Sequence, residues 1–204
     1  MFIRLMLLCL FIFSQTVMAI EEPKFDVIEK TDAFELRAYQ PLIVAEVLMD
    51  GDMKQASSKG FKLIAEYIFG NNKSKTGASE KISMTAPVTL EPKSEKVAMT
   101  APVAVQKDAS KWRVHFVMPR QYTIETLPTP NNSQVSLREV AAKKFAVVRF
   151  SGLVGEEKVA TKTAELQAWL ATKQITPTGT PELARYNPPW TLPFLRRNEI
   201  LIEY

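Results

Sequence analysis

A short segment that occurs twice constrains this chain more than any other feature. Residues 81–88 read KISMTAPV and residues 96–103 read KVAMTAPV. Both copies alternate with the period of a β-strand, so we predict two paired or sequential strands, with Met84 and Met99 on an apolar face and the threonine after each methionine on the other. Proline lacks the N–H of a central ladder, so these strands should be edges or carry bulges. The methionine stripe suits either the hydrophobic core or one wall of a ligand site.

The N-terminal residues have the pattern of a secretory signal. Arg4 precedes an apolar run over residues 5–13, and the segment ends in Val-Met-Ala at residues 17–19. The run is too short to span a bilayer, and the small residues suit a signal peptidase. We therefore predict a signal peptide over residues 1–19 with cleavage near Ala19, a periplasmic or secreted protein, and no membrane span after cleavage.

The remaining residues, 20–204, have the size of a single domain. The only cysteine, Cys9, lies in the predicted signal peptide, so the mature chain has no disulfide, thiolate ligand or cysteine nucleophile. The formal charge of +4 comes from interspersed lysines, arginines and acids without a basic block, which disfavours nucleic-acid binding. We expect a monomer.

A second, larger duplication divides this domain into similar halves. Each half has two strand-like segments followed by an amphipathic segment with helical spacing. The strands are residues 34–39 and 43–47 in the first half and 135–140 and 145–148 in the second, and the helices are residues 53–69 and 156–172. The pattern predicts two β-β-α-β units, with further strands at 111–118 and 198–204. We expect an α+β fold in which a twisted antiparallel sheet curls toward a barrel and packs two helices.

Few residues could support catalysis. His115 is the only histidine, so any Ser-His-Asp triad or multi-histidine metal site must include it. Strand alternation places it with Arg113 on the predicted outer face, as either a surface residue or an axial haem ligand. The glycines near Gly51 and Gly152 lack the spacing of phosphate loops. With no catalytic constellation, we expect a protein that is not an enzyme, and the identity of any metal ligand stays unknown.

Soft and aromatic apolar residues recur beside lysines of the first predicted helix. They are Met53, Phe61, Met84, Met99 and Met118, beside Lys54, Lys59 and Lys62. An apolar wall with a cationic rim suits a flat hydrophobic ligand that carries carboxylates. The same residues could equally be core side chains beside solvated lysines.

Several longer motifs occur along the chain. They are FELRAY at 34–39, YIFGN at 67–71, the paired MTAPV, FVMP at 116–119, YTIETLP at 122–128, FSG at 150–152, YNPPW at 186–190 and PFLRRNE at 193–199. With these motifs, the chain resembles the SOUL haem-binding protein family from Pro23 to Tyr204. The resemblance implies a distorted β-barrel with two helices that binds haem or a related tetrapyrrole non-covalently and without catalysis.

The resemblance also implies where a ligand would lie. In animal members, a shallow hydrophobic site beside the first helix holds the ligand, basic residues meet the propionates, and at least one branch needs no axial histidine. In this chain that segment carries Met53, Lys54, Ser57 and Phe61. Together with Met84, Met99 and His115, these are the predicted binding residues.

Two other functions fit the same pattern. The barrel also resembles effector-binding domains of bacterial drug-responsive regulators, so the chain could be a general small-molecule binding domain. A hydrolase that uses carboxylates on a hydrophobic ligand is the third possibility, although no nucleophile motif supports it.

Overall fold

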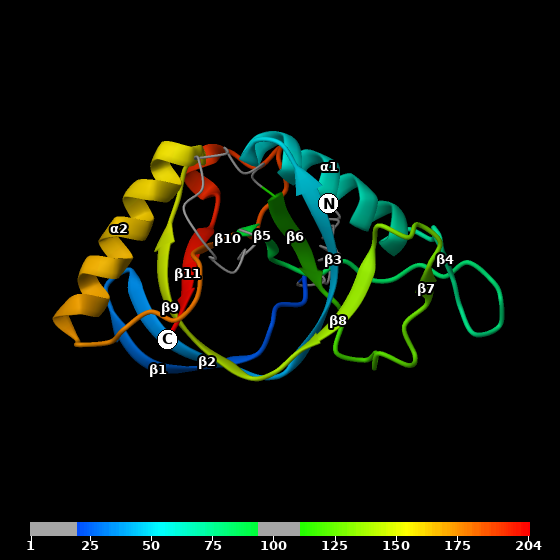
Figure 1. Ribbon diagram of the computed structural model, residues 1–204, viewed down its shortest axis with the longest axis horizontal. Coiled ribbons are helices and arrows are strands. Elements are labelled where there is room, and N and C mark those ends of the chain that lie inside the picture. Colours follow the sequence, from blue (N-terminus) through cyan, green and yellow to red (C-terminus); the bar gives the residue numbers. More distant parts are fainter. Residues whose placement is uncertain (1–19, 94–110) are drawn as a thin grey trace, which may run out of the picture.

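One strongly curled antiparallel sheet of nine strands forms the body of the protein, and two helices pack against it (Figure 1). The computed structural model describes residues 20–93 and 111–204. Across the sheet, the strands are β1 (Phe25–Thr31), β2 (Phe34–Tyr39), β9 (Lys143–Phe150), β11 (Asn198–Glu203), β10 (Glu182–Arg185), β5 (Val88–Lys93), β6 (Lys111–Val117), β3 (Leu42–Asp50) and β8 (Ser136–Val140). The helices are α1 (Met53–Ile68) and α2 (Glu156–Thr172). A small ladder joins β4 (Asn72–Lys73) to β7 (Thr129–Pro130), and a 3-10 helix, η1, covers Pro193–Leu195. The predicted α+β architecture is confirmed.

The strand order has an internal symmetry that matches the duplicated sequence. With β1 set aside, the order β2-β9-β11-β10 from one edge corresponds to β8-β3-β6-β5 from the other. The two halves join where β5 pairs with β10, with Leu90 opposite Leu183. Along the chain, each repeat is a β-β-α-β-β unit, one strand longer than the predicted unit, because β6 and β11 belong to it. The first strand of each repeat, β2 or β8, pairs with the other repeat, so each half of the sheet contains one exchanged strand.

Local capping residues set the limits of the first helix. Asp52 adopts an extended backbone, and its Oδ1 accepts a hydrogen bond of 2.8 Å from the backbone N–H of Gln55. Beyond the last turn, Gly70 has a φ of +117°, which only glycine adopts without strain. The predicted helix over 53–69 is confirmed to within one residue. The second predicted helix, 156–172, matches α2, whose first turn places Glu156 and Glu157 at the positive end of the helix dipole.

The apolar core lies between the helices and one face of the sheet, which we call the helix face. Helix α1 packs on β3 and β6, and α2 packs on β9 and β11. Its fully buried side chains include Ile64, Tyr67, Leu166, Leu170, Val47, Phe116, Val148 and Ile200. Each such side chain contributes about 1.5–3 kcal/mol by leaving water.

Neither α1 nor α2, the α-helices within the described ranges, has the length and hydropathy needed to cross a membrane.

The first copy of the repeated segment differs from its predicted strand. Residues 81–87 form an extended loop, and regular pairing begins only at Val88. Thr85 is buried because its hydroxyl donates a hydrogen bond to the carbonyl of Val117, whereas Met84 is 36% exposed. Ile82 and Ala86 are buried as predicted, but the predicted facing of Met84 and Thr85 was wrong, since a hydrogen bond at the end of β6 holds the threonine inside. The second copy, with Met99, lies outside the described residues.

Close packing of α1 on β6 leads to a stability prediction at Gly60. A Cβ atom added there would lie 2.6 Å from Cγ2 and 2.7 Å from Cβ of Val114, whose branched side chain cannot move aside. We expect Gly60→Ala to lower the free energy of unfolding by about 1–2 kcal/mol in urea denaturation, because overpacking outweighs the gain of about 1 kcal/mol that alanine usually brings to a helix.

Gly155→Ala is the matched control for this variant. Gly155 precedes α2 with a φ of −125°, and an added Cβ meets nothing within 4 Å. Because Gly155 is the N-cap of α2, where glycine is preferred over alanine, the effect of this control should stay below about 1 kcal/mol. Equal stability of the two variants would show that α1 does not lie this close to β6.

Candidate ligand-binding site

A hollow of about 650 Å³ opens between the N-terminal ends of the two helices. It is lined by Gly51, Asp52 and Met53 at the start of α1, by Glu156, Val159 and Ala160 at the start of α2, and by Trp112 of β6. Figure 1 shows that the two helices start close together and diverge from there, α1 over β3 and β6 and α2 over β9 and β11. The symmetry of the fold therefore brings together residues that lie more than a hundred positions apart in the sequence.

Three of these residues give the hollow an apolar wall. Met53 is almost fully buried as the first residue of α1, and Val159 is half-buried in the first turns of α2. The indole Nε1 of Trp112 donates a hydrogen bond of 3.1 Å to the carbonyl of Gly51, which fixes the orientation of the ring. Trp112 and Val159 were not among the predicted binding residues. Strand and helix periodicity placed both on apolar stripes, but only the three-dimensional symmetry shows that the two stripes meet.

The other predicted residues of α1 continue along the same helix. Lys54 is exposed, Ser57 is half-buried, and Phe61 is 38% exposed. The Ser57 hydroxyl accepts a hydrogen bond of 3.3 Å from Nη1 of Arg185, and the ring centroid of Phe61 lies 5.4 Å from that of Phe116. Because β10 and β6 supply these partners, Ser57 and Phe61 point toward the side of α1 that faces α2.

The remaining predicted residues lie elsewhere. Met84 precedes β5 next to Thr85, which contacts the last residue of β6, whereas Trp112 lies at the start of that strand. His115 points to the opposite face of the sheet, since its neighbours Val114 and Phe116 are in the helix-face core. The structure thus places four of the predicted residues along α1, with Met53 at the hollow. Met84 follows Ile82, whose backbone N–H donates to the carbonyl of Ile68 at the other end of α1, and His115 lies on the opposite face of the sheet.

A second hollow, of about 530 Å³, contains Met118 of the predicted apolar wall but none of the other residues predicted to bind a ligand. It is lined by the turn between β2 and β3, the end of β6 and the end of β8, including Ile43, Met118 and Tyr122. Across residues 20–93 and 111–204, no group of three or more His, Cys, Asp or Glu side chains is arranged to hold a metal ion.

The face of the sheet opposite the helices, which we call the inner face, lies inside the curl and carries His115. Register pairs His115 with Glu46 of β3 and Thr89 of β5. The prediction that His115 shares a face with Arg113 is right, but the prediction that this face is the outer one was wrong. Alternation separates the two faces of a strand without showing which one the curl encloses. Burial lowers the pKa of His115 to about 4, and its Nδ1 has no hydrogen-bond partner among the described residues, so the imidazole is neutral at pH 7.

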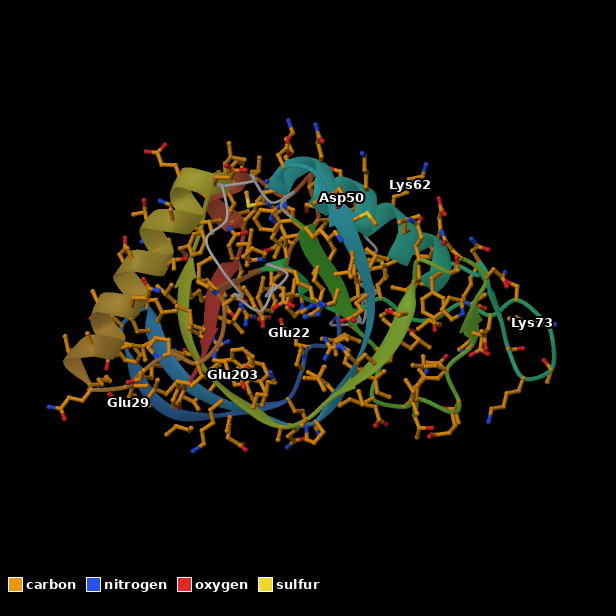
Figure 2. All side chains as sticks on the ribbon, viewed as in Figure 1. Glu22, Glu29, Asp50, Lys62, Lys73 and Glu203 are labelled. Carbon is orange, nitrogen blue, oxygen red and sulfur yellow. The ribbon has the colours of Figure 1, made fainter. Side chains whose placement is uncertain are left out.

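Paired charges line both halves of the inner face. In one half, Glu46 accepts hydrogen bonds of 3.0 and 2.7 Å from Arg138. In the other, Arg37 donates bonds of 2.8 and 3.1 Å to Glu199, which is fully buried. Burial alone would raise the pKa of Glu199, but the hydrogen bonds and charge of Arg37 lower it. Figure 2 shows Glu22 and Glu203 within the same curl, where Glu22 pairs with Arg197 at 2.9 Å and Glu203 with Lys143 at 2.6 Å.

One carboxyl of the inner face lacks such a partner. In the antiparallel pairing of β10 with β5, Leu183 lies opposite Leu90, so the preceding Glu182 lies beside Glu91. Glu91, however, already forms an ion pair with Arg113. Within the described residues, Glu182 makes no ion pair. Burial, reinforced by the charge of Glu91, raises its pKa to about 8. The group therefore adds stability while protonated, fully below its unfolded pKa of about 4.5, and that contribution is lost as the pH rises through about 8.

We expect Glu182→Gln to remove this pH dependence. From pH 5 to pH 9, the free energy of unfolding of the wild type should fall by about 2–4 kcal/mol more than that of the variant, because the amide of the variant never ionises. Denaturant unfolding at several pH values measures the difference. Glu157→Gln, exposed on α2, is a control with the same charge change. Parallel pH profiles for wild type and Glu182→Gln would refute the burial of an unpaired carboxyl.

Comparisons with known proteins agree with this fold. The crystal structure of the EcmrR C-terminal domain matches with a TM-score of 0.59 and 11% identity, covering 83% of this chain and 95% of that one. A hydrolase from Listeria innocua matches with a TM-score of 0.56 and 16% identity, covering 86% and 93%. At these identities, the likeness shows the fold alone.

Sequence comparison is more specific. No curated protein matches the chain. The family model described as SOUL heme-binding protein, however, matches residues 20–203, which is nearly the whole sequence and all of the described sheet and helices. The chain therefore belongs to the SOUL heme-binding protein family.

Proposed function

We propose that this protein binds haem or a related tetrapyrrole non-covalently in the hollow between the starts of α1 and α2. The family match over residues 20–203 carries the proposal. The hollow supports the location because Met53, Trp112 and Val159 offer an apolar wall, one member of which is a hydrogen-bonded indole. Ligand sites of this kind are mostly apolar, with a few polar groups that set orientation.

The charged residues around the hollow orient such a ligand. Asp52 and Glu156 lie at its rim and repel the propionate groups of a tetrapyrrole. Lys54 is exposed on the next position of α1 and attracts them. The apolar edge of the macrocycle should therefore enter the hollow, with its carboxylates directed along α1 and away from the helix starts.

His115 is not suited to ligate iron bound in this position. It lies on the inner face, so the sheet itself separates its imidazole from the hollow. The residues that surround the hollow bind the macrocycle by contact and charge, and we propose binding without catalysis.

A bulky residue in the hollow should block the ligand. Ala160 is exposed on α2 and lines the hollow, so Ala160→Trp fills the space without removing a core side chain. We expect it to raise the Kd for haemin at least about tenfold, which corresponds to about 1.4 kcal/mol, in a Soret absorbance titration. Ala171→Trp, exposed near the other end of the same helix, should bind haemin like the wild type.

A variant of His115 tests the alternative that this histidine ligates the haem iron. His115→Ala should leave the haemin affinity and the Soret spectrum unchanged. A spectrum that His115→Ala abolishes, combined with normal binding by Ala160→Trp, would place the iron at His115 and refute the hollow as the site.

A general small-molecule binding domain is the second candidate, because a mostly apolar hollow with few polar groups selects ligands weakly. Competition with unrelated aromatic compounds separates the two functions. Selective retention of haemin supports tetrapyrrole binding, whereas comparable affinity for flat aromatic compounds without carboxylates favours the general function.

We also propose that the protein is exported and acts in the periplasm or outside the cell. The proposal rests on Arg4, the apolar run that follows and the Val-Met-Ala sequence before Ile20, all outside the described residues. N-terminal mass spectrometry of protein from its native host should find Ile20 as the first residue. Retention of Met1 would contradict export by cleavage.

A further inference from the structure

Arg185 is an arginine with no carboxylate partner in a structure where most partly buried arginines have one. It ends β10 on the helix face and is half-buried, and among the described residues its side chain donates to the Ser57 hydroxyl alone, at 3.3 Å. By contrast, ion pairs with carboxylates hold the buried Arg37 and the partly buried Arg113, Arg138 and Arg197. Within residues 20–93 and 111–204, no ion pair of Arg185 is formed.

The charge that acts on the pKa of Arg185 is that of another cation, Arg196. Arg196 donates to the backbone carbonyls of Thr191 and Pro189, so its guanidinium fixes a loop and makes no ion pair among the described residues. Burial lowers the pKa of Arg185, and the charge of Arg196 lowers it further. A partly desolvated cation beside a second cation is unfavourable without an anion, and both would gain from one.

The loop between these two arginines exposes large apolar side chains. Trp190 is 84% exposed and Phe194 is 70% exposed, and Leu192 and Leu195 are also exposed. The loop is held in place, since the backbone N–H of Gly152, shortly before α2, donates to Pro193 at 2.9 Å. Its two ends therefore lie close to both helices: Arg185 contacts α1, and η1 contacts the segment that leads into α2.

We infer that Arg185, together with the Ser57 hydroxyl, binds a carboxylate of the ligand, while the apolar loop of residues 190–195 covers part of its hydrophobic body. This inference rests on the proposed function. Ser57 follows Met53 by four residues, about 6 Å along the helix, so a flat ligand in the hollow can reach both. The planar guanidinium matches a carboxylate with two parallel hydrogen bonds, which gives orientation as well as charge.

The test compares a ligand with and without its carboxylates. Haemin and haemin dimethyl ester share the macrocycle and iron, but only haemin carries free carboxylates. We expect Arg185→Gln to raise the Kd for haemin at least about tenfold, while its Kd for the dimethyl ester equals that of the wild type. Arg185→Lys should recover part of the haemin affinity, because it restores the charge without the fork.

Arg149→Gln is the matched control, with the same loss of charge from an exposed arginine on the inner face. It should bind both ligands like the wild type. A thermal melt of each variant checks that Arg185→Gln remains folded.

Three results would overturn the inference in different ways. Wild-type protein that binds neither ligand would remove the proposed function and this inference with it. Wild-type binding of haemin that Arg185→Gln leaves unchanged would remove only the role of Arg185. An equal loss of affinity for haemin and its dimethyl ester in Arg185→Gln would show that Arg185 supports the structure of the site and does not bind a carboxylate.

Discussion

The pairing of β5 with β10 is the contact on which the rest of the structure depends. It joins two similar halves into one antiparallel sheet, with Leu90 opposite Leu183 at the junction. Because both halves have the same strand order, their helices fall on the same face of the sheet, and the starts of the helices converge. The hollow between Met53 and Val159 is thus a product of duplication, and neither half would form it alone.

The two faces of the sheet are shielded from water in different ways. The helix face is covered by α1 and α2 and is apolar, as close packing requires. The inner face is enclosed by the curl of the sheet itself and holds many charges in ion pairs, such as Arg37 with Glu199. Breaking one such buried pair costs about 3–5 kcal/mol, because the remaining charge stays buried alone. The ion pairs of the inner face therefore stabilise the fold, whereas Arg185 on the helix face has no carboxylate partner among the described residues, which supports its proposed contact with a ligand.

Much of the fold follows from local signals in the sequence. Asp52 and the glycine at position 70 set the ends of α1 through a side-chain cap and a positive φ, both of which are local properties. Strand alternation correctly separated His115 from Val114 and Phe116. It could not show that the face of His115 is enclosed, because enclosure depends on how far the whole sheet curls.

The site was less predictable than the fold. Residues of α1 could be proposed through family resemblance, but Trp112 and Val159 join them only through the symmetry of the assembled sheet. The facing of Met84 and Thr85 was predicted wrongly because residues 81–87 lie outside the regular strand pairing. There, the hydrogen bond from the Thr85 hydroxyl to the carbonyl of Val117 determines which side chain is buried. Arg185 carries no sequence signal at all, since the absence of a nearby carboxylate is a property of distances in three dimensions.

The placement of the ligand on the helix face is tested most directly by paramagnetic broadening from ferric haem. In methyl-labelled protein, bound high-spin haemin broadens the NMR signals of methyl groups near the iron and spares those far from it. We expect the methyl signals of Met53 and Val159 to broaden first, while those of Val44 and Val117 on the inner face stay sharp. Broadening of the inner-face methyl groups with sharp signals for Met53 and Val159 would contradict a site between the helices.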